Sequence, residues 1–121
     1  MRGALAAADS EQWVLWLKAN KDYLYVGLCD EDLCSDMSRA LLLLFGLLQD
    51  LALPTFATLF SSLRMLSGPE GHRDCQAQAD ILLTSLLRMG APFAGAVSKL
   101  VAEFEPSMRI ALPGVVQLVE A

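Results

Sequence analysis

One apolar stretch constrains the fold of this chain more than any other feature. Residues Ala40–Leu63 read ALLLLFGLLQDLALPTFATLFSSL and contain a single charged side chain, that of Asp50. A stretch of about 20 apolar residues is long enough to cross a bilayer. However, an aspartate near the bilayer centre costs roughly 2.5–3.5 kcal/mol, and Pro54 removes a backbone donor and crowds the preceding helical turn. We therefore predict two helices that meet near Pro54, and no membrane span.

The two predicted helices differ in how their apolar residues are distributed. In the first, Leu41, Leu44 and Leu48 share one face, and further leucines and a phenylalanine occupy most of the others. A helix that is apolar nearly all round is central in its domain or shared with a partner. The second helix has one apolar stripe beside polar residues, formed by Phe56, Leu59, Phe60 and Leu63. We expect the helix at Arg39–Leu53 to be central and the second helix to have one side in water.

Turn and capping residues divide the rest of the chain into further helices. Asp9 can cap a helix that runs to Ala19, after a flexible start at residues 1–8. Gly90 is placed to end a helix that begins at Asp74, and Pro92 opens the next one. Because the apolar spacing is helical and does not alternate, we predict one all-α domain, 1–121, of five to six helices.

Composition narrows the classes of function. Apolar residues make up 55% of the chain and charged residues 19%, against the 45–50% apolar content usual in soluble domains, so some apolar surface should be left over. The net charge of −5 and the scattered basic residues disfavour nucleic acid, which requires clustered Lys and Arg. Three cysteines are too few, and odd in number, for a secreted disulfide framework. We expect a cytoplasmic or nuclear protein.

Acidic residues and prolines recur at matching intervals. Asp36 precedes Pro54 by the same interval as Asp74 precedes Pro92, and the leucines between them match in register. The stripe of the second helix has a counterpart in Phe93, Ala96, Val97 and Leu100. Segments 36–66 and 74–104 thus resemble the helical hairpins of HEAT and armadillo proteins, whose repeats span about 40–47 residues. The resemblance implies a short stack of helical hairpins; an irregular helical bundle would give similar spacings and is the alternative.

One set of residues could bind a metal. The pairs Cys29-x4-Cys34 and His72-x2-Cys75 contain every cysteine and the only histidine of the chain. Three thiolates and one imidazole are a set that structural zinc favours. If the two hairpins stack in parallel, Cys34 and His72 become neighbours. The sequence therefore raises the hypothesis of a structural zinc ion, with small buried cysteines that bind nothing as the alternative.

The excess of apolar helical surface favours a non-enzymatic protein–protein interaction module, such as an adaptor, a scaffold segment or a homodimer. Its partner would be another protein or a second copy of the chain. We expect one of the two stripes to face outward as the docking surface, which involves Phe56, Leu59, Phe60, Leu63, Phe93, Val97 and Leu100. A small acidic chaperone for a secretion or assembly substrate and a zinc-stabilised helical binding domain are the alternatives. No motif identifies a substrate or a reaction, so we expect no enzyme.

Overall fold

The computed structural model describes residues 7–60 and 72–121, and within these ranges the protein is all-α, as predicted. The elements are α1 (Ala7–Ala19), α2 (Lys21–Cys29), α3 (Cys34–Leu48), the 3-10 turn η1 (Gln49–Ala52), α4 (Leu53–Phe60), α6 (Arg73–Arg88), α7 (Phe93–Ala111) and α8 (Pro113–Glu120). Because α1 begins at Ala7, Asp9 lies in its first turn and not at the predicted cap. Most of the predicted flexible start lies outside the described residues.

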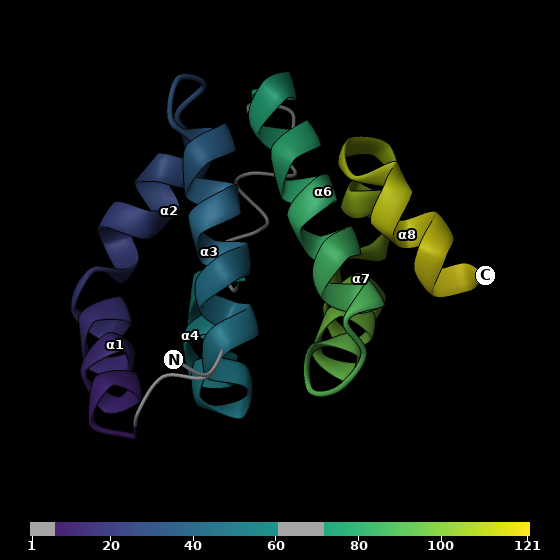
Figure 1. Ribbon diagram of the computed structural model, residues 1–121. Helices are drawn as coiled ribbons and strands as arrows, with labels where there is room; N and C mark the ends of the chain where they lie inside the picture. Colours follow the sequence, from purple (N-terminus) through teal and green to yellow (C-terminus); the bar gives the residue numbers. More distant parts are fainter. Residues whose placement is uncertain (1–6, 61–71) are drawn as a thin grey trace.

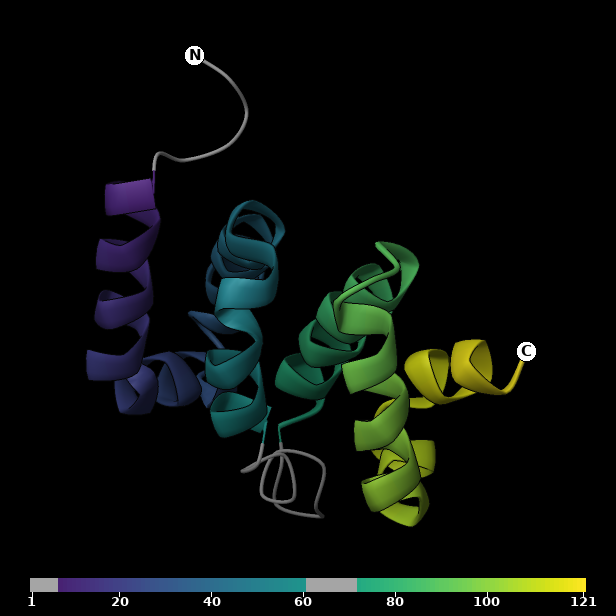
Figure 2. The same cartoon turned by 90° about the horizontal axis from the view of Figure 1, so that it is seen from below.

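Helices α3 and α6 stand side by side at the centre of the molecule and run in the same direction (Figure 1). Contacts near both ends of the pair agree with this direction: the Cys34 thiol meets that of Cys75, and a Cβ on Gly46 would lie 3.3 Å from Cε of Met89. α1 and α2 lie on one side of the pair, and α8 lies on the other. Seen from below, α4 and the first part of α7 lie behind the pair (Figure 2).

The chain turns between α3 and α4, as the sequence predicted, although the turn begins a few residues before Pro54. Gln49 has a φ of +53° and follows directly after α3, and Pro54 is the second residue of α4. Among the described residues, Cys34–Phe60 alone passes a test for a membrane span by length and composition. In this structure the segment is not one straight helix, and α3 contributes only 15 residues, fewer than the roughly 20 that a span requires.

The core lies where α4 and α7 cross the back of the α3–α6 pair. Three phenylalanines from different helices meet there: the Phe45 and Phe93 rings stack with centroids 5.7 Å apart, and Phe56 lies 6.2 Å from Phe45 and 6.1 Å from Phe93. All three side chains are buried. Offset and edge contacts of this kind stabilise a core beyond the area that they bury.

A carboxylate in the middle of α6 holds the N-terminus of α8. The Asp80 carboxylate accepts hydrogen bonds from the backbone N–H groups of Gly114, at 2.9 Å, and Val115, at 2.7 Å. Residue 114 must be small, because a Cβ there would lie 2.7 Å from Oδ2 of Asp80. Asp80 therefore caps a helix far away in sequence. An ion pair between Arg109 and Glu120 also joins α7 to α8.

Two further sequence predictions concern α6 and α7. Gly90, with a φ of +82°, follows Met89 at the end of α6, which confirms its role as a helix-ending glycine. α7 continues past the predicted boundary as far as Ala111, but its backbone is non-helical at Phe104, two residues before Pro106. The end expected at residue 104 therefore appears as a kink, because a proline removes a hydrogen bond from the turn before it.

Candidate functional site

The three cysteines come together where α2, α3 and α6 meet. Cys34 is the first residue of α3 and Cys75 the third residue of α6, and both side chains are buried. The Cys75 thiol neighbours the Cys34 thiol, and Cys29 lies close enough to act on it electrostatically. Burial raises the pKa of Cys75 to about 12, and the neighbouring Cys34 sulfur adds to this effect. At neutral pH the Cys75 sulfur therefore carries its proton.

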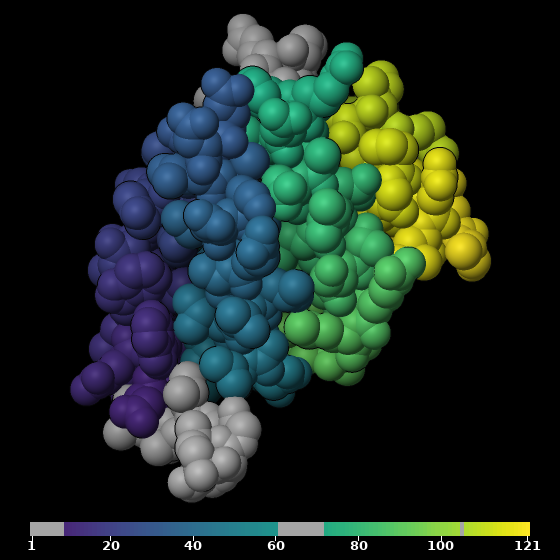
Figure 3. Space-filling model, turned by 45° about the horizontal axis from the view of Figure 1, so that its top comes forward, coloured from purple at the N-terminus to yellow at the C-terminus, as the bar shows by residue number. Residues whose placement is uncertain are grey.

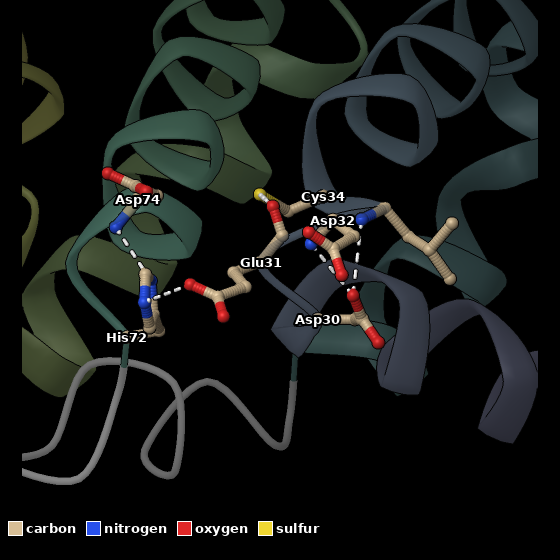
Figure 4. A network of polar contacts seen from close by, with 7 residues as sticks. Asp30, Glu31, Asp32, Cys34, His72 and Asp74 are labelled. Carbon is tan, nitrogen blue, oxygen red and sulfur yellow. Dashed lines mark hydrogen bonds and ion pairs between the residues drawn. The ribbon is translucent and has the colours of Figure 1, made fainter.

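His72 does not join the cysteines. Its Nδ1 accepts a hydrogen bond from the backbone N–H of Asp74 at 3.1 Å, so the side chain caps α6. Its Nε2 lies 2.7 Å from a carboxylate oxygen of Glu31, in the loop before α3. Figure 4 shows the imidazole between these two partners, whereas the Cys34 sulfur points toward α6. Since Nδ1 is an acceptor, the neutral ring has its proton on Nε2, which donates to Glu31.

These contacts correct the geometry expected of the zinc site. The prediction required Cys29, Cys34, His72 and Cys75 to converge, and the imidazole is turned to a carboxylate instead. The one group of three or more metal-ligating side chains that lies close together among the described residues is Glu31, His72 and Asp74, all exposed. In that group both ring nitrogens already have hydrogen-bond partners. A metal ion at either set of residues would have to displace the cap of α6 or the contact with Glu31.

The predicted docking stripes lie in the core. Phe56, Leu59 and Phe60 of α4 and Phe93, Val97 and Leu100 of α7 are all buried within the chain; Leu63 lies outside the described residues. The expectation that one of the two stripes faces outward is therefore wrong for the residues that the structure describes. The physical reason is that the two stripes cover each other and the α3–α6 pair, so each supplies the burial that the sequence had assigned to a partner.

Large apolar side chains elsewhere among the described residues are exposed. Six of them lie on α1, on α3 and in or directly after α6, and we group them as the α1–α3–α6 face: Trp13, Trp16, Leu43, Leu47, Ile81 and Met89. The exposed fractions are 69% for Leu43, 41% for Leu47, 57% for Ile81 and 43% for Met89. The atoms of the three helices form one continuous surface in the space-filling view (Figure 3).

A groove of about 550 Å3 runs between α1 and α3 at one side of this face. Its walls include Trp13 and Trp16 from α1 and Ala40 and Leu44 from α3. The two indole rings meet edge to face, with centroids 5.7 Å apart, and they are the only tryptophans in the chain. Helix α3 therefore has two environments. One side is buried in the core, and another side borders an open apolar groove.

Polarity changes along the face. On α3 the exposed positions pass from Asp36 and Arg39 near the start of the helix to Leu43 and Leu47 further on. On α6, Asp74 in the first turn is followed by exposed Ile81. Since the two helices run in parallel, their polar ends lie together near His72, and the apolar part of the face lies toward their C-terminal ends.

The sequence of α3 carries a signal for this face. Leu43 and Leu47 lie on the side of α3 opposite the Leu41 and Leu48 stripe, which is why the helix is apolar nearly all round.

Comparison with protein-family models, curated proteins and solved structures found no match for the chain.

Proposed function

We propose that this protein is a non-enzymatic interaction module that binds another protein, or a second copy of itself, through the α1–α3–α6 face. The observation that carries the proposal is the exposure of Leu43, Leu47, Ile81 and Met89 on two adjacent helices beside a groove that both tryptophans line. Large apolar side chains grouped on one surface mark interaction sites more often than single exposed ones do.

The energetics favour a partner that covers the whole set. Full burial of a side chain the size of leucine contributes about 1.5–3 kcal/mol, whereas association costs roughly 4–15 kcal/mol in lost freedom. Burial of one leucine is therefore too small to offset the cost of association, whereas burial of several together can offset it. Tryptophan is enriched among residues that dominate binding energy, so we assign Trp13 and Trp16 the role of anchors at the groove.

The partner in this proposal presents an apolar surface to the C-terminal part of α3 and a bulky apolar side chain to the groove. Charged residues at the N-terminal ends of α3 and α6 have both signs, as with Asp36 and Arg39, so they set the orientation and rate of encounter more than the affinity.

Tryptophan fluorescence provides a direct readout, because both fluorophores lie at the proposed site. For self-association, dilution of the purified protein should shift the emission to longer wavelength as dimers dissociate, and light scattering should show the mass fall in parallel. Leu43→Asp should weaken association by about tenfold or more. Ile110→Asp is the matched control, since Ile110 is 85% exposed and belongs to α7, outside the face; it should change neither signal.

For a different partner, a photo-crosslinking amino acid replaces Leu43 in one variant and Ile110 in another. A binding partner should be captured from position 43 and not from position 110, and Leu47→Asp should abolish the capture. The proposal is wrong if the protein stays monomeric at all concentrations and both positions yield the same crosslinked products. It is also wrong if Leu43→Asp and Ile110→Asp affect association equally.

A further inference from the structure

The cysteine cluster has no part in the proposed function, yet it joins the two central helices. Cys34 begins α3 and Cys75 lies in the first turn of α6. Both belong to the hydrophobic core, and neither forms a disulfide in this structure. The Cys34 sulfur points from α3 toward α6 (Figure 4), and the Cys75 thiol of α6 is its neighbour. A disulfide would require them to close to about 2.05 Å.

We propose that Cys34 and Cys75 form a reversible disulfide that ties α3 to α6 when the protein is exposed to hydrogen peroxide. The Cys34 thiolate attacks one peroxide oxygen, the O–O bond breaks, and protonation of the other oxygen releases water, which leaves a sulfenic acid on Cys34. The Cys75 sulfur then attacks the Cys34 sulfur. The S–O bond breaks, and the hydroxide leaves with the Cys75 proton as a second water. The two thiols lose two electrons in total, which reduce the peroxide to two molecules of water.

The surroundings make this reaction slow and selective. The raised pKa of Cys75 keeps its sulfur protonated at neutral pH, and thiolates are the reactive form. The Cys34 thiol donates a hydrogen bond to the backbone carbonyl of Glu31, with the sulfur 3.7 Å from the oxygen. The loop that contains Glu31 must therefore loosen before a peroxide reaches Cys34. We expect disulfide formation to be slower than between two free cysteines, because Cys75, which attacks the sulfenic acid in the second step, stays protonated at neutral pH.

The disulfide would act on the α1–α3–α6 face through its helices, a consequence that rests on the proposed function. Leu43 and Leu47 lie on α3, and Ile81 and Met89 follow α6 to its end. A covalent bond near the start of the pair fixes the spacing of the two helices. The oxidised protein would then present the same face with less freedom for α3 and α6 to separate.

The test treats the folded full-length protein with excess hydrogen peroxide, alkylates the remaining thiols and maps the peptides by mass spectrometry. We expect one linked peptide pair, Cys34 with Cys75, that has lost two hydrogen atoms and reverts with dithiothreitol. Closing a loop of this length should raise the melting temperature by on the order of 10 °C. Cys29→Ser is the matched control and should keep both effects, whereas Cys34→Ser and Cys75→Ser should lose them.

Mapping of the unmutated protein keeps the test independent of whether the variants fold. The proposal is overturned if the linked pair includes Cys29, if the cysteines oxidise singly to sulfinic acid, or if linkage appears only in denaturant. None of these outcomes tests binding through the α1–α3–α6 face, because the disulfide is detected by mass spectrometry on the protein alone. Conversely, a protein that oxidises as expected and binds nothing through Leu43 would refute the proposed function alone.

Discussion

Two sets of apolar side chains in this protein are similar in composition but differ in burial. The stripes on α4 and α7 are buried, and the α1–α3–α6 face is exposed. Phe56 and Phe93 in the stripes are buried, while Leu43 and Ile81 on the face are mostly exposed. Each set follows helical spacing along its own helix. Apolar periodicity therefore identifies the faces of a helix but not which of them finds a neighbour within the chain.

The difference follows from the number of neighbours on each side. α4 and α7 pack against each other and across the back of α3 and α6, so that Phe45, Phe56 and Phe93 interlock. The front of α3 has no described helix over it, and its flanks are occupied by α2 and α6. An apolar helix in that position is left uncovered on one side.

The strongest test of the comparison uses two leucines of the same helix. Leu41→Ala should lower the free energy of unfolding by about 2–5 kcal/mol, because Leu41 is fully buried and its loss leaves a cavity. Leu43→Ala, with the same chemical change on the exposed side, should alter it by less than about 0.5 kcal/mol. Urea denaturation followed by circular dichroism measures both. Equal losses at the two positions would mean that the face is covered in solution.

A second test exposes the buried face of α8 by removing the side chain that caps this helix. Asp80→Ala removes both acceptors for the N–H groups at the start of α8, and we expect a loss of about 1–3 kcal/mol. Local hydrogen exchange should increase in α8 as Val115 and Val116 lose their cover. Asp80→Asn, which keeps one acceptor oxygen, should have a smaller effect. Unchanged exchange in α8 would show that apolar packing alone holds this helix.

The smallest effect is expected from a polar atom on the inner side of α3. The Ser38 hydroxyl is buried and has no hydrogen-bond partner among the described residues. Ser38→Ala removes a desolvated group and should raise the free energy of unfolding by about 1 kcal/mol. The control is Ser85→Ala in α6, where the hydroxyl donates to the carbonyl of Ile81 at 2.8 Å, so no gain is expected. A loss of stability in Ser38→Ala would reveal a partner for the hydroxyl in solution.

Local features of the fold were predictable because their causes lie within a few residues. Gly90 ends α6 because glycine adopts a positive φ without strain, and Pro106 bends α7 for want of a backbone donor. The break after α3 was predicted from Asp50 and Pro54, although Gln49 is where the backbone departs from the helix. Local sequence signals therefore indicate reliably that a helix ends. They indicate less reliably the residue at which it ends.

The candidate sites depended on contacts between distant segments, and there the sequence was a weaker guide. It made Cys34 and His72 neighbours if the hairpins stack in parallel, whereas in the structure the neighbour of Cys34 is Cys75 and His72 turns to Glu31. Spacing along the chain could not show this, since a cap on Asp74 and a carboxylate in another loop compete for the imidazole. The hydrogen bonds available in three dimensions decided the orientation of the ring.

The pattern of residues alone indicated a helical protein, the ends of α1 and α6, and an apolar content above that usual for soluble domains. Only the tertiary structure decided which apolar side chains are left outside. The stripes of α4 and α7 enter the core because they can cover each other, whereas Leu43, Leu47 and the two tryptophans face outward. Burial depends on neighbours brought together by the whole fold, and hydrophobic attraction, having no direction, does not encode which neighbour that will be.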